Sequence, residues 1–154
     1  MNAGADTLRT LLADCRCAGH CHLPHDQRAA VEAAARELGF VRLEADLGRL
    51  RKASSVLVRL GRDLDLPEWY GANFDALADC LTDFDGNEAP GYVLLLSGGN
   101  LLRADDVAAG RTLDEVLTFA IGHWREAGIP FWVFDATRAD TLPAFPPLPA
   151  ASAG

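Results

Sequence analysis

The sequence lacks a long apolar run and an excess of positive charge. No apolar stretch approaches the roughly 20 residues that a membrane-spanning helix needs. The opening Met-Asn-Ala-Gly-Ala-Asp has neither the basic nor the apolar region of a secretory signal. Lys and Arg total 14 against 22 Asp and Glu, a formal net charge of −8. Nucleic acids and anionic lipids require basic surface. We therefore expect a cytoplasmic protein that binds neither nucleic acid nor membrane and whose charge favours a cationic partner.

A disulfide framework is also missing. Three of the four cysteines lie within seven residues, and the fourth, Cys80, lies far along the chain, so we expect free thiols. Histidines flank the third of these cysteines, and the whole group could supply zinc ligands: Cys15, Cys17, His20, Cys21, His22 and His25. Their spacing matches no standard zinc-binding pattern. Alternatively, residues 19–23 form a short edge strand that ends at Pro24. We expect no metal and no cofactor.

Recognisable catalytic motifs are absent as well. The chain has no glycine-rich phosphate loop, no nucleophile elbow and no metal-binding signature. Asp75 and Asp79 could form an acid–base pair, and Cys80 could be a thiol nucleophile beside a histidine. No pattern in the sequence indicates a cleft around these residues, so we expect a protein that is not an enzyme.

The pattern of apolar residues predicts an α/β fold. Strand-like apolar runs begin near Phe40 and occupy residues 92–96 and 131–134. Segments with helical periodicity lie between or before them, at residues 6–14, 27–38, about 55–64, 74–83 and 112–127. Continuous apolar strands separated by helices indicate a small three-stranded parallel sheet packed by helices. Residues 1–38 would be an N-terminal helical and strand extension packed on this core, residues 39–136 the main domain, and residues 137–154 a flexible tail rich in Pro and Ala.

The predicted helix at 74–83 carries three carboxylates on one side. Asn73 is suited to cap it, and Asp75, Asp79 and Asp83 follow at intervals of four residues. An adjoining apolar stripe beginning at Phe74 would hold the helix on the core. The acidic row is either a solvated helix face or an interaction surface that accepts hydrogen bonds from a cationic partner.

Residues 66–84, LPEWYGANFDALADCLTDF, resemble the barstar family. The resemblance extends more loosely over residues 39–135 and implies a three-stranded parallel sheet with packed helices. It also implies a function: an intracellular inhibitor, or immunity protein, that blocks the active site of a microbial ribonuclease and protects the producing cell. The family's central aspartate falls on Asp79, where it takes the place of a substrate phosphate, and a second aspartate falls on Asp75. The resemblance further implies that Trp69 packs against the enzyme and that Gly71 allows close approach of the backbones.

Two positions depart from the family pattern. Ala78 replaces an interface aromatic, and His123 replaces a glutamate of the last helix that touches the enzyme. The partner is therefore expected to be a cationic ribonuclease or a related toxin enzyme, and the alternative is a barstar-like module that binds a different partner. Tyr70 could equally be a core residue, and His123 an ordinary surface histidine. The candidate partner-binding residues are Trp69, Tyr70, Gly71, Asn73, Asp75, Asp79, Asp83 and His123.

Overall fold

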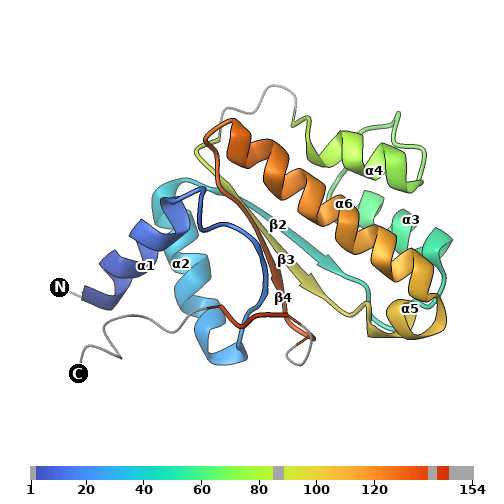
Figure 1. Ribbon diagram of the computed structural model, residues 1–154, viewed down its shortest axis with the longest axis horizontal. Coiled ribbons are helices and arrows are strands. Elements are labelled where there is room, and N and C mark those ends of the chain that lie inside the picture. Colours follow the sequence, from blue (N-terminus) through green and yellow to red (C-terminus); the bar gives the residue numbers. More distant parts are fainter. Residues whose placement is uncertain (1–2, 85–88, 139–141, 146–154) are drawn as a thin grey trace.

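The computed structural model of the protein describes residues 3–84, 89–138 and 142–145 (Figure 1). Its centre is one parallel sheet of four strands in the order β1–β4–β3–β2. Three of them are the predicted strands: β2 (Val41–Asp46), β3 (Tyr92–Ser97) and β4 (Phe131–Asp135). The fourth, β1 (His20–His22), pairs with β4 at the edge of the sheet. The observed sheet thus has one strand more than the three that the sequence predicts. The additional strand is β1, which confirms the alternative of an edge strand in residues 19–23.

Helices cover both faces of the sheet (Figure 1). Their bounds are α1 (Ala3–Ala13), α2 (Arg28–Leu38), α3 (Ala53–Asp63), α4 (Phe74–Leu81), α5 (Asn100–Asp105) and α6 (Val107–Glu126), with a 3-10 turn η1 (His25–Gln27) before α2. Within the described ranges, none of these helices is both long and apolar enough to cross a membrane.

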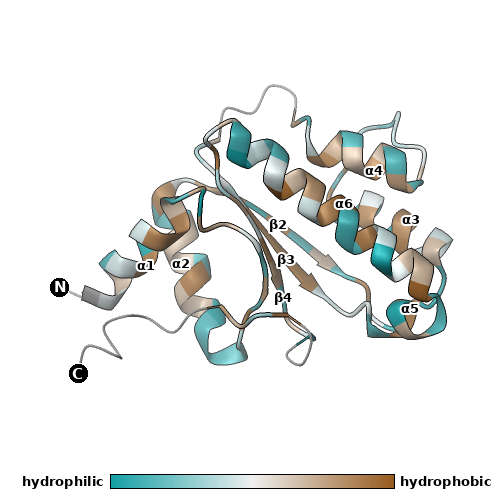
Figure 2. Cartoon of the chain, in the orientation of Figure 1, coloured by the Kyte–Doolittle hydropathy of each residue, from teal (hydrophilic) through white to brown (hydrophobic). Residues whose placement is uncertain are grey.

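Two apolar clusters, one on each face, explain why the central strands are apolar throughout. Tyr92, Leu94 and Val133 join the cluster beneath α3, α4 and α6. The alternate residues Val93 and Trp132 join a second cluster that includes residues of α1 and α2. Figure 2 shows the resulting apolar band along β3 and β4, between the two helical layers. Because successive side chains of a strand point to opposite faces, a strand covered on both sides needs apolar residues at every position.

Part of the C-terminal segment extends the sheet beyond β1. The backbone N–H of His22 donates to the Pro143 carbonyl at 2.9 Å, and the N–H of Phe145 donates to the His22 carbonyl at 2.7 Å. The ring of Phe145 is buried against Trp132 and Phe134. The sequence predicts a flexible tail from residue 137, yet these described residues of it pack on the domain; the rest of the expected tail, residues 139–141 and 146–154, lies outside the described residues.

Helix α6 begins five residues earlier than the sequence predicts. Thr112, the first residue of the predicted segment, lies inside the helix, and the Asp106 side chain caps the helix by accepting a hydrogen bond from the Ala109 N–H at 3.0 Å. Gly110 lies within the helix at a point where Arg103 of α5 approaches closely. A β-carbon at this glycine would lie 2.8 Å from Cγ of Arg103 and 3.0 Å from its Cα. The glycine serves close packing and does not interrupt the helix.

Candidate docking surface of α4 and the loop before it

The loop before α4 is held against α3 by Tyr70. The Tyr70 hydroxyl donates to the Leu57 carbonyl at 2.8 Å, and burial raises the pKa of this phenol to about 12. The ring lies over Gly61, where an added β-carbon would come within 2.7 Å of Cε2 of Tyr70. Tyr70 is therefore half-buried and supports the loop from below, which accords with the alternative of a core position for this residue.

Replacing Gly61 by Ala should displace Tyr70 and loosen this loop. The rigid ring cannot move aside as the end of a flexible side chain would, so we expect Gly61→Ala to lower the free energy of unfolding by about 1–3 kcal/mol. Gly122 of α6 is the matched control, because a β-carbon there would meet nothing within 4 Å. Gly122→Ala should raise helix propensity and stabilise the protein by roughly 0.5–1 kcal/mol. Urea unfolding of the two variants measures both effects, and equal stabilities would contradict the assigned role of Gly61.

Trp69 projects outward from the same loop. Its side chain is 57 % exposed, although an indole has a large apolar surface whose burial is favourable. Beside it lies a groove of about 420 Å³ between the loop, β2 and the end of α4, with Trp69, Leu43 and Asp83 among its lining residues. The loop thus presents a large aromatic side chain next to a concave surface.

The backbone at Ala72 and Asn73 connects the loop to the first turn of α4. Ala72 adopts a left-handed conformation, with a φ of 51°, and Asn73 then caps the helix as predicted, accepting a hydrogen bond from the Ala76 N–H at 2.7 Å. Gly71 is exposed, and an added β-carbon there would lie 3.1 Å from Nδ2 of this capping Asn73. A side chain at Gly71 would therefore crowd the cap that starts the helix.

The acidic row on α4 is shorter than the sequence predicts. Asp75 and Asp79 lie on its exposed side, while Leu77, Cys80 and Leu81 are buried. The helix ends at Leu81, so Asp83 follows the helix and does not continue the row. Asp83 is exposed and instead lines the groove beside Trp69. The α4 surface therefore presents two carboxylates one helical turn apart, with a third close to the groove.

His123 lies on α6, which packs against α4. It is exposed and makes an edge-to-face contact with Trp124, with ring centroids 5.2 Å apart. The Trp124 indole N–H donates to the Leu81 carbonyl at 2.8 Å, which fixes the last turn of α4 to α6. His123 therefore stands near the C-terminal end of α4.

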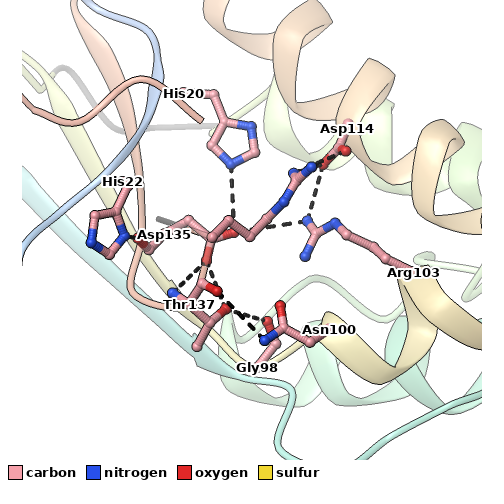
Figure 3. A network of polar contacts seen from close by, with 9 residues as sticks. His20, His22, Gly98, Asn100, Arg103, Asp114, Asp135 and Thr137 are labelled. Atoms are coloured by element: carbon pink, nitrogen blue, oxygen red, sulfur yellow. Dashed lines mark hydrogen bonds and ion pairs between the residues drawn. The ribbon is translucent and has the colours of Figure 1, made fainter. Parts of the chain in front are cut away.

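A second polar cluster, absent from the predicted site residues, surrounds Asp135 at the end of β4 (Figure 3). Its carboxylate is fully buried and accepts hydrogen bonds from the N–H and the hydroxyl of Thr137, both at 2.9 Å. His20 and Arg103 approach its other oxygen to 3.7 and 3.8 Å. Burial alone would raise the pKa of this carboxyl, but the contacts from His20, Thr137 and Arg103 outweigh burial and hold the pKa below its usual value. The signal in the sequence was a single aspartate closing the apolar strand FWVFD.

The Asp135 cluster joins separate parts of the fold. His20 comes from β1, Arg103 from α5 and Asp135 from β4, and Arg103 also binds Asp114 of α6 at 3.0 Å. Of the cysteine–histidine group of the N-terminal region, His20 and His22 contact Asp135, His22 through Nδ1 at 3.0 Å from the Asp135 carbonyl oxygen. Cys21 is buried on the other face of β1, where burial raises its pKa to about 12. Among the described residues, no group of three or more His, Cys, Asp or Glu is arranged to hold a metal ion. The geometry is that of a structural network.

Comparison with known proteins assigns the central part of the chain. The profile of the Barstar (barnase inhibitor) family matches residues 40–136, which include the loop, α4 and the strands β2, β3 and β4. A comparison with curated proteins found no match. The matched region contains the exposed Trp69 and both carboxylates of α4, and it covers more than half of the chain. The protein therefore belongs to the barstar (barnase inhibitor) family.

Proposed function

We propose that the protein is a cytoplasmic inhibitor that blocks the active site of a barnase-like microbial ribonuclease. The loop and α4 enter the substrate cleft: Asp79 and Asp75 accept hydrogen bonds from the cationic groups that bind RNA phosphates. Trp69 packs on the rim of the enzyme and Gly71 allows the backbones to approach. Asp83 and His123 extend the contact, while Tyr70 and Asn73 position the loop and helix. In this role the protein is a binding protein and an antitoxin, without catalysis of its own.

The distribution of charge carries this proposal. Residues 63–102 contain eight acidic residues and no Lys or Arg, so this segment alone accounts for the whole net charge of −8 and the rest of the chain is balanced. Within the described residues, Asp75, Asp79 and Asp83 form no ion pair. Elsewhere many carboxylates are paired, as Glu32 and Glu44 are with Arg42. Unpaired like charges gathered on one surface favour association with a cationic protein.

Titration of a ribonuclease with the protein tests the proposal. The enzyme would be a barnase-like ribonuclease, ideally one encoded beside the gene, with barnase as a second probe, and the readout is the initial rate of RNA cleavage. We expect cleavage to stop at one equivalent of inhibitor and the association rate to fall as salt is added, because the attraction is electrostatic. Unchanged cleavage by both enzymes in the presence of excess protein would refute it.

A different cationic toxin enzyme is the second candidate partner. The observation in its favour is the change at two contact positions, to Ala78 on α4 and to His123 on α6. Failure of the ribonuclease titration, followed by capture of another cationic enzyme encoded in the same region, would support this second candidate.

A further inference from the structure

A second exposed aromatic side chain lies beyond the predicted surface, on α6. Four large apolar side chains are exposed in the described part of the chain: Val58, Trp69, Val107 and Phe119. Only Trp69 and Phe119 among these four are aromatic, and Phe119 is 58 % exposed. Its neighbours on the outer side of α6 are polar, including Glu115 and Thr118. More than half of this side chain remains in contact with solvent, so the fold leaves most of its apolar surface available to a partner.

The contacts of α6 place Phe119 on the flank next to α4. The other flank is occupied: Arg125 donates to the Ala18 carbonyl near β1, and Asp114 binds Arg103 of α5. Each helical residue advances about 100°, so Phe119 lies roughly 120–140° around the helix from both. His123, one turn further on, shares the flank of Phe119 and adjoins the Trp124 contact with the end of α4.

Helix α4 packs against α6 and carries a small side chain, Ala78, beside its two carboxylates. Ala78 packs against the apolar cluster to which Val116 and Ala120 of α6 also belong, and at about 100° per residue it lies roughly 160° around α4 from Cys80. Cys80, on the other side of α4, lines the groove that also contains Trp69. The exposed carboxylates of Asp75 and Asp79 therefore lie on the outer side of α4, between Ala78 and the side that borders the groove of Trp69.

We propose that Phe119 is a second anchor of the docking surface, which determines which cationic enzyme the protein accepts. This inference rests on the proposed function. A charged centre bordered by aromatic residues excludes water on binding, which strengthens the ion pairs at the centre. The partner consequently has an apolar recess beside its cationic cleft, offset by about 10 Å, the spacing of two packed helices. An enzyme with a polar or charged rim at that place would bind weakly even if its cleft attracted Asp79.

Phe119→Ala tests this assignment in a binding assay with the ribonuclease that the wild-type protein inhibits. We expect the dissociation constant to rise about tenfold, through faster dissociation and with an unchanged dependence of the association rate on salt. Val107→Ala is the matched control: this side chain is 61 % exposed on the same helix but lies about 18 Å away along its axis. The control should bind as the wild type does. Thermal unfolding of both variants verifies that the fold is retained.

Binding by three variants and by the wild-type protein tests the role of Phe119 separately from the inhibitor function on which that role rests. Strong loss of binding by Asp79→Ala, with Phe119→Ala indistinguishable from Val107→Ala, would overturn the role of Phe119 and leave the inhibitor function standing. Loss of binding by both Asp79→Ala and Phe119→Ala, with Val107→Ala unaffected, supports both. Absence of binding by the wild-type protein to the nearby ribonuclease and to barnase would overturn both.

Discussion

Asp79→Ala should weaken binding to the inhibited ribonuclease by about 3–5 kcal/mol, which corresponds to a factor of roughly 10²–10³ or more in the dissociation constant. The carboxylate of Asp79 is exposed and forms no ion pair within the described part of the chain. In the complex it would be buried against cationic groups of the enzyme. Removing it leaves those groups desolvated without a partner, and that penalty adds to the lost attraction.

The fold should not suffer from this substitution. Asp79 stands in the middle of α4 one turn after Asp75, so its removal relieves a like-charge repulsion of a few tenths of a kcal/mol. Calorimetric titration would measure the affinity, and urea unfolding the stability. Asp26→Ala is the matched control because it removes the same charge from the exposed turn η1 beside α2. An affinity loss as small for Asp79→Ala as for Asp26→Ala would contradict the central place of Asp79 in the docking surface.

Asp135→Asn should be the most destabilising of the conservative substitutions considered. It removes the charge that faces His20 and Arg103 in a fully buried site. Breaking a buried charge contact on one side typically costs about 3–5 kcal/mol, because the remaining charges stay desolvated. For a chain of this length we expect the midpoint of thermal unfolding to fall by roughly 10 °C. Asp105→Asn is the control, since Asp105 binds Arg51 at 2.8 Å but on the surface, where such pairs contribute about 0–1 kcal/mol.

The same carboxylate predicts how stability depends on pH. Because the pKa of Asp135 is lower in the folded protein than in the unfolded chain, its contribution is fully present above the unfolded value near 4 and is lost as the pH falls through the folded value. Wild-type protein should therefore lose more stability than Asp135→Asn between pH 5 and the acid limit of folding, which urea unfolding at a series of pH values would measure. Parallel pH profiles of the two proteins would show that Asp135 is not charged in the native state.

Local sequence determined the features that depend on neighbouring residues. The runs YVLLL and FWVF predicted buried strands because a strand covered on both faces needs apolar side chains throughout. Asn73 predicted the start of α4 because a cap bonds a backbone group three residues away. The exposed Trp69 and the carboxylates of α4 were also found from the sequence, since their motif is contiguous.

Tertiary structure alone decided the features that join distant parts of the chain. A three-residue strand such as His20–His22 has too little pattern to predict, and it exists because β4 supplies its hydrogen bonds. Tyr70 became a support of the loop because Gly61, nine residues earlier, leaves room for its ring. Asp135 contacts His20, which lies more than a hundred residues earlier in the sequence, and Arg103, which lies about thirty residues earlier. The helix that carries Phe119 lies beside the acidic helix only because α6 packs on α4, a proximity that no spacing along the chain encodes.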